Sequence, residues 1–317
     1  MKPTRRQFLA TGAVVGAGAL AGCDQIPFIG GDGGIGQFTN WVPEAGEIEP
    51  NSETVNFNAT SPTQIHSNRT NLRPSTYQRE QRTYRTGVQW QSLSMSLSME
   101  GGAVYKGSYN ADDVASELTS PNGSGDDGEF SKEDSEGNYD IFIPSSANGP
   151  EEASEAWAVS GNAIISARPT GSEFQDNFSS AVANAKAIIT VGENGENRAV
   201  DDSDDFNALA NELSGTIASG RTRREEVGSD RESIAQGEFE GMVASGASIS
   251  INGSNSNIKQ VFVFDNESDV STDDLEEYVE RNDTGGGILS YARDINVNQN
   301  GNAGIVNATV DTYDIGR

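Results

Sequence analysis

Cys23 and His66 are the side chains best suited to nucleophilic or metal chemistry, and the chain has one residue of each type. Zinc and blue-copper centres need several His or Cys ligands. We therefore expect no metal and no cofactor. A Ser-His-Asp site would have to use His66, which lies in a polar stretch where we expect it to be exposed to solvent. With one cysteine, a disulfide within the chain is excluded.

Carboxylates are abundant, with 48 Asp and Glu residues against 21 Lys and Arg. The acidic clusters at residues 126–129, 201–205 and 273–277 offer oxygen ligands for calcium, but none has the EF-hand spacing, and we expect them to be solvated surface. Two carboxylates are enough for glycoside hydrolysis. Because a chain with so many acids contains many carboxylate pairs by chance, their presence does not indicate a hydrolase. The sequence shows no G-x-S-x-G, H-E-x-x-H or P-loop pattern. We predict no catalytic residue and a protein that is not an enzyme.

The N-terminal 22 residues have the pattern of a signal peptide: a basic start, an apolar run over residues 8–20 and a small-residue exit. The run contains glycines and is shorter than the roughly 20 residues of a spanning helix, so we expect it to be removed. The alternative is a short anchor that stays in the membrane. Arg5 and Arg6, followed by Phe8 and Leu9, resemble the twin-arginine export signal, which routes folded proteins across the membrane.

Leu20, Ala21 and Gly22 precede Cys23 and resemble a lipobox, the site at which a lipoprotein signal is cut and the cysteine is acylated. Cys23 is therefore our predicted lipidation site. This interpretation implies contact with the export and lipoprotein-processing machinery. It also places the chain on the outer face of the cytoplasmic membrane, held there by its N-terminal lipid.

The formal net charge of −27 predicts a halophilic protein. The Debye length falls from about 8 Å at 0.15 M salt to about 3 Å at 1 M, so molar salt screens the self-repulsion of such a surface. The same negative net charge argues against nucleic acid as a partner, because binding to phosphates needs a basic patch. Five arginines between Arg69 and Arg85 form a basic island, which either neutralises acidic neighbours within the fold or contacts anionic headgroups.

Hydrophobic periodicity predicts the secondary structure. Residues 89–99 are the clearest strand, because Leu93, Met95, Leu97 and Met99 alternate with serines. Further strands are expected at residues 52–59, 103–109, 139–143, 157–159, 163–167, 241–251, 258–264, 288–297 and 305–313. Helices are expected from the Asn110 cap to Leu118 and over residues 173–191, 201–214 and 273–281, with Phe178 among the inward side chains of the second.

These elements predict an α+β fold with largely antiparallel sheets and helices packed on one face. Residues 104–118 and 261–279 both read as strand, acidic turn and helix, which indicates two structurally similar halves. We divide the chain into the signal at 1–22, a lipid-anchored glycine-rich tether at 23–51, a first half at 52–220, a polar linker at 221–235 and a smaller second half at 236–317. Trp41 is expected to be a buried plug at the domain edge, or else a membrane-interface aromatic.

Eight asparagines begin N-x-S/T sequons, the acceptor pattern for N-glycosylation, and we expect some of them to be modified. They are Asn58, Asn68, Asn122, Asn177, Asn252, Asn266, Asn282 and Asn307.

Several loose patterns resemble a family of twin-arginine-exported lipoproteins of halophilic archaea whose function is uncharacterised. They are Trp41-Val42-Pro43, the run 105–109 leading into 111–114, the strands around Ile141 and at 157–159, and residues 201–213 and 261–264. The resemblance implies an exported, membrane-tethered domain and supplies no catalytic residue. We expect a non-enzymatic domain that binds a partner or organises the envelope. The alternatives are a solute-binding lipoprotein of a transporter and, last, a carboxylate-dependent hydrolase.

Overall fold

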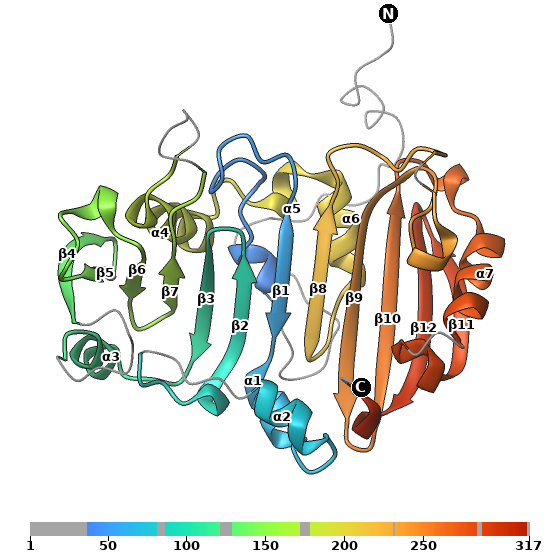
Figure 1. Cartoon of the computed structure of the whole chain (residues 1–317), viewed down its shortest axis with the longest axis horizontal. Coiled ribbons are helices and arrows are strands. Elements are labelled where there is room, and N and C mark those ends of the chain that lie inside the picture. Colours follow the sequence, from blue (N-terminus) through green and yellow to red (C-terminus); the bar gives the residue numbers. More distant parts are fainter. Residues whose placement is uncertain are drawn as a thin grey trace, which may run out of the picture.

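The computed structural model describes residues 37–80, 86–120, 129–171, 178–230, 232–283 and 287–315. The signal residues, Cys23 and the first part of the tether, up to residue 36, lie outside these ranges. The described residues form one antiparallel sheet of twelve strands, in the order β11-β12-β10-β9-β8-β1-β2-β3-β7-β6-β5-β4 (Figure 1). The strands are β1 (Asn56–Thr60), β2 (Leu93–Met99), β3 (Gly102–Gly107), β4 (Phe130–Glu136), β5 (Tyr139–Pro144), β6 (Ala156–Val159), β7 (Ile164–Ala167), β8 (Ile217–Thr222), β9 (Met242–Asn252), β10 (Asn255–Phe264), β11 (Arg293–Asn300) and β12 (Ala303–Asp311).

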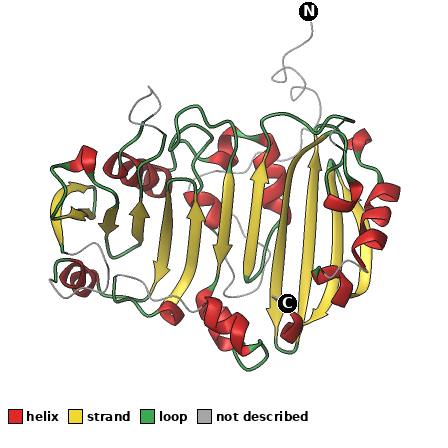
Figure 2. Ribbon diagram, viewed as in Figure 1, coloured by secondary structure: helices red, strands yellow, loops and turns green. Residues whose placement is uncertain are grey.

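Helices surround this sheet (Figure 2). They are α1 (Pro62–Ser67), α2 (Pro74–Glu80), α3 (Ala111–Leu118), α4 (Ala181–Ile189), α5 (Ala199–Asp202), α6 (Asp204–Glu212) and α7 (Thr272–Asp283), with a π-helix at Thr190–Asn194 and several 3₁₀ turns. The predicted α+β class and the antiparallel arrangement are confirmed, although the strands form a single sheet.

The main core lies between one face of the sheet and helices α4 and α6. Phe57, Leu97 and Val104 point into it from the central strands, and Ile188 and Phe206 close it from the helices. This side follows the alternation of apolar residues that the sequence shows. Burial of these side chains contributes the largest favourable term to folding, about 25 cal/mol for each Å² of apolar surface.

The helices were expected on one face, and the structure corrects this, because α3 and α7 pack on the opposite face near the two ends of the sheet. Under α3 lie Phe142 and Trp157, and under α7 lie Phe262 and Phe264. In these outer strands neighbouring residues are apolar, as in the buried run Val261–Phe264. A strand that is apolar on both sides needs cover on both sides, and the helices that follow β3 and β10 supply it.

The two halves share an order of elements and meet in the middle of the sheet. Hairpin β2–β3 leads to α3, and hairpin β9–β10 leads to α7. Strand β7 then lies beside β3, as β12 lies beside β10, and the strands that precede the hairpins, β1 and β8, pair with each other. The predicted linker at 221–235 therefore begins within a strand, because Arg221 and Thr222 are the last residues of β8 and pair with β9.

Other elements differ from the predicted pattern. Strand β4 was not predicted, since only Phe130 among its residues is apolar and buried. Helices α1 and α2 were not predicted. The expected helix at 173–191 begins after its N-cap Ser180, so Phe178 lies outside it, and residues 172–177 are outside the described ranges. Ser203 interrupts the helix expected at 201–214 and caps α6.

Trp41 is buried, as predicted, with 2% of its surface exposed. Its ring lies against Gly192 of the π-helix, and a Cβ added there would lie 2.1 Å from a ring atom. The contact ties the first described segment of the chain to the helical layer. Only glycine fits at this position without displacing the ring.

We predict that Gly192→Ala destabilises the fold by about 1–3 kcal/mol, because overpacking forces the Trp41 ring or the backbone to move. Thermal unfolding followed by circular dichroism measures the effect. Gly161→Ala is the matched control, since a Cβ there meets nothing within 4 Å. Equal melting temperatures of the two variants would contradict this role of Gly192.

Candidate binding groove

A groove of about 710 Å³ lies over the central strands, on the face opposite the main core. Its floor crosses β10, β9, β8, β1 and β2, and residues 236–238 and α7 form one wall. Four spacings of about 4.8 Å between neighbouring strands make the floor roughly 19 Å wide. The lining residues are Asn56, Phe57, Asn58, Ser98, Met99, Glu100, Ser219, Gly220, Arg221, Gln236, Gly237, Glu238, Ser245, Gly246, Ala247, Gln260, Phe262 and Tyr278.

The groove follows from the period of two in the central strands. Asn56 and Asn58 alternate with Phe57 and Ala59, which point into the core, and Ser98 alternates in the same way on β2. Asparagine and serine are short, so the floor is low between the helices that cover the outer strands. The same alternation that builds the core therefore leaves a row of hydroxyl and amide groups facing solvent.

Charges in the groove are few and largely paired. Arg221 Nη2 lies 3.0 Å from Glu238 Oε1, and the other carboxylate oxygen of Glu238 contacts Arg223. Glu100 is the third charged residue in the lining, beside Arg221 and Glu238. The arginine–glutamate contacts hold the Glu238 carboxylate at the edge of the groove and balance its charge.

Glu100 retains its proton to an unusually high pH. Partial burial raises the pKa of this carboxyl to about 7, and a hydrogen bond and charge repulsion from Glu49 add to the effect, while Ser52 opposes it. The Ser52 hydroxyl lies 3.1 Å from Glu100 Oε2. Glu44 and Glu49 line the small cavity behind Glu100. Two neighbouring carboxyls favour sharing a proton over ionising together. Near neutral pH the groove is therefore close to uncharged, in a chain of net charge −27.

The wall at α7 combines an aromatic ring with an unused acceptor. Tyr278 packs edge-on against Phe262 with ring centroids 5.5 Å apart, and burial raises the pKa of its hydroxyl. The Gln260 side chain hydrogen bonds with Tyr278. Its Oε1 atom is buried and has no hydrogen-bond partner within the described part of the chain. A ligand hydroxyl or amide that reached this oxygen would satisfy it, because a buried acceptor without a partner costs free energy.

The residues singled out from the sequence lie elsewhere. The export signal Arg5, Arg6, Phe8 and Leu9, the lipobox and Cys23 are outside the described residues. His66 was expected in solvent, but it is partly buried on α1, and its Nδ1 lies 2.7 Å from the Tyr77 hydroxyl. In the described ranges no three His, Cys, Asp or Glu side chains are grouped to hold a metal ion.

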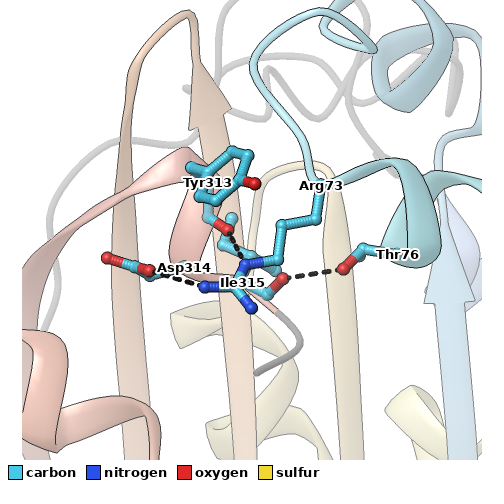
Figure 3. Close-up of polar contacts among 5 residues, drawn as sticks. All are labelled: Arg73, Thr76, Tyr313, Asp314 and Ile315. Atoms are coloured by element: carbon cyan, nitrogen blue, oxygen red, sulfur yellow. Dashed lines mark hydrogen bonds and ion pairs between the residues drawn. The ribbon is translucent and has the colours of Figure 1, made fainter.

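The basic island is used within the fold at Arg73 (Figure 3). Its Nε donates a hydrogen bond of 2.9 Å to the Tyr313 carbonyl, its Nη2 lies 3.4 Å from Asp314 Oδ1, and its guanidinium stacks 4.8 Å over the Tyr313 ring. Thr76 adds a hydrogen bond of 3.1 Å to the Ile315 carbonyl. These contacts fasten α2 to the C-terminal segment. They correspond to the first of the two roles expected for the island.

Sequence reasoning did not find the groove. Its floor is made of common residue types, and the strands that carry them are far apart in the chain. Glu238 was assigned to the start of the second half, and Arg221 to a linker. The one available signal was the polar face of the strand at 89–99, which was recognised as a strand face but not as a binding surface.

No helix in the described ranges is both long enough and apolar enough to cross a bilayer.

We predict that Glu100→Gln removes a pH dependence of stability. The folded protein holds this proton to about pH 7, whereas an ordinary glutamate loses it near 4.5, so the wild-type free energy of unfolding falls as pH rises between these values. The variant lacks this pH dependence. In the wild type, the slope of the free energy of unfolding against pH corresponds to at most about one bound proton. Urea unfolding at pH 4.5 to 8 measures it, with Glu276→Gln on the exposed side of α7 as control. Identical slopes for wild type and Glu100→Gln would contradict the assignment.

No protein-family model and no curated protein matches the chain. Among solved structures it is similar to two crystal forms of TP0453. Form I is 5% identical with a TM-score of 0.41, over 86% of this chain and 94% of that chain. Form III is 6% identical with a TM-score of 0.42, over 86% and 95% of the two chains. A likeness at this level supports no inference about function.

Proposed function

We propose that this chain is a membrane-anchored extracellular binding protein that holds a neutral, hydroxyl-rich ligand, an extended oligosaccharide, in the groove over its central strands. The observation that carries the proposal is the contrast in charge. The chain has a net charge of −27, yet the groove has one ion pair, one carboxyl that keeps its proton to about pH 7, and otherwise uncharged side chains.

The chemistry of the floor selects the ligand class. Asn58, Ser98 and Ser219 each offer both donor and acceptor groups, and sugar hydroxyls need both. Drug-like ligands usually bind in enclosed pockets, whereas this floor faces solvent and carries short hydroxyl and amide side chains. The net charge of −27 disfavours anionic ligands. At the α7 wall, the Tyr278 ring and the unpaired Gln260 oxygen offer an apolar edge beside an acceptor.

The width of the floor favours an oligomer over a single sugar. A ligand that reaches from Glu100 on one side to Tyr278 on the other crosses five strands, roughly 19 Å. Along this path β2, β1, β8 and β9 each offer a short hydroxyl or amide, and β10 offers the longer amide of Gln260. A repeating ligand matches a repeating surface.

The proposed location rests on the sequence. Residues 1–22 read as a twin-arginine signal and Cys23 as the lipidation site, which would anchor the folded domain outside the cell. The acidic composition suits such a domain in molar salt. Its role in this setting is to bind, as a surface-tethered module, a glycan of the envelope or the medium.

The transporter alternative is less well supported. A solute-binding lipoprotein is expected to have two α/β lobes about a cleft, whereas the described strands form one antiparallel sheet and the groove lies on its face. One observation favours hydrolysis as a second candidate. Glu100 and Glu238 both line the groove, the first with a raised pKa and the second ion-paired with arginine. Glycosidases use a protonated and an ionised carboxyl in this way.

We predict that neutral hexasaccharides, tested as maltohexaose and cellohexaose, bind more tightly than glucose and than an oligogalacturonate of equal length. Asn58→Ala should weaken binding several-fold to about tenfold, the effect of about 1 kcal/mol for a lost hydrogen bond. Calorimetry in molar KCl measures the affinities. Asn257→Ala is the matched control, because Asn257 is exposed on β10 and alternates with the groove residues Gln260 and Phe262, so it faces the other way.

The same experiment separates the candidates. Tight binding of glucose alone would favour a solute-binding protein. Shorter sugars appearing with time, and no longer appearing with Glu100→Gln, would support the hydrolase. No binding of any hexasaccharide, or equal effects of Asn58→Ala and Asn257→Ala, would overturn the proposed function.

We predict that Cys23→Ser releases the protein from the membrane, because an acylated N-terminus requires the thiol. Phase separation in detergent measures this: the wild type should enter the detergent phase and the variant the aqueous phase. Ser146→Cys in the Cys23→Ser background is the control, since it restores a thiol at an exposed position away from the lipobox. Partitioning of the Cys23→Ser variant into the detergent phase would contradict the assignment of Cys23 as the lipid-bearing residue.

A further inference from the structure

Six of the eight sequon asparagines lie in the described ranges, and most of them have an amide that is already in use. Asn282 donates to the Tyr278 carbonyl at 2.9 Å, and Asn307 donates to Asn298 Oδ1 at 2.9 Å. Asn266 donates to Asp269 Oδ2 at 2.9 Å. In each case the nitrogen that would carry a glycan is held by another part of the fold.

Asn58 and Asn68 are unsuitable for different reasons. Asn58 lies within β1 in the middle of the sheet, on the groove floor. Asn68 uses both ends of its side chain: Nδ2 donates to the Gln64 carbonyl at 2.9 Å, and Oδ1 accepts from the Gly253 backbone at 3.1 Å. Modification of Asn68 would break the contact that fastens the turn around Gly253.

Asn252 differs from the other five. It is the last residue of β9, exposed, at the turn to β10, which lies at the lower edge of the sheet in Figure 1. Its side chain has no hydrogen-bond partner in the described part of the chain. The next residue, Gly253, has φ +64° and open space around it, and Ser254, which completes the sequon, is exposed. Both sequon side chains are therefore exposed at a turn whose Gly253 backbone is held by Asn68.

We propose that Asn252 is the N-glycosylation site among the sequons described by the structure. The amide nitrogen Nδ2 forms a bond to C1 of a sugar carried on a polyprenyl phosphate. The bond from C1 to the phosphate oxygen breaks, the phosphate keeps the electron pair, and the amide proton is transferred to it. A protein that is already folded when it meets the transferase offers only surface turns as acceptors, and the twin-arginine signal predicts export in the folded state.

Mass spectrometry of the full chain tests this, after production in a host whose surface proteins carry Asn-linked glycans. We expect a glycan mass on the peptide that contains Asn252, absent from Asn252→Gln and from Ser254→Ala. Asn266→Gln is the control and should retain it. Melting temperatures should be equal for all variants, because all three substituted residues are exposed.

An unmodified Asn252 overturns the proposal, whatever is found at Asn122 or Asn177, which lie outside the described residues. Modification of Asn68, Asn266, Asn282 or Asn307 in the folded protein also overturns it, since it would show that engaged amides are accepted. Modification of Asn58, within the central sheet, overturns it as well. A glycan at Asn252 alone, or at Asn252 with Asn122 or Asn177, supports it. None of these outcomes depends on ligand binding in the groove.

Discussion

Packing of one apolar face of the central strands against α4 and α6 is the interaction on which the rest of the structure depends. The chain has 34% hydrophobic residues, and it concentrates them where a single layer of helices can cover them. Phe57 and Leu97 point into this layer, and their neighbours in each strand are polar. The bare face over β1, β2 and β8 is thus a consequence of how little apolar surface the chain has to bury. Strands β5, β6 and β10, which are apolar on both sides, have α3 and α7 as cover.

An open sheet of this size has two unpaired edges, and both are unsuited to pairing with another strand. Edge strand β4 has charged residues and a register shift between Lys132 and Asp134. At the other edge, β11 shows a shift between Arg293 and Asn296, with Asp294 at φ 53°. Bulges and charges at an edge disfavour strand addition. Hence the surfaces left for recognition are faces of the sheet.

The sequence predicted what depends on local periodicity and missed what depends on distant pairing. Leu93, Met95, Leu97 and Met99 alternate with serines, and they lie in β2. Asn110 was the expected cap, and its side chain accepts a hydrogen bond from the first turn of α3. Strand β8, by contrast, has the sequence IASGRT. Its apolar residues, Ile217 and Ala218, are adjacent, so the strand shows no clear alternation. It becomes a strand because β1 and β9 flank it. Since the groove needs that placement to bring Arg221 and Ser219 beside Asn58, no local signal could have revealed it.

The position of the groove also links it to the assembly of the two halves. Its floor takes β1 and β2 from one half and β8, β9 and β10 from the other, so a ligand that fills it contacts both sides of the β1–β8 pair. Such a ligand binds only when this central pair is formed. By mass action it stabilises the joined state by RT ln(1 + [L]/Kd), about 2.7 kcal/mol at a hundred times Kd. The acidic surface opposes compactness most strongly in dilute salt, and that is where a neutral ligand across the junction would have its largest visible effect on folding.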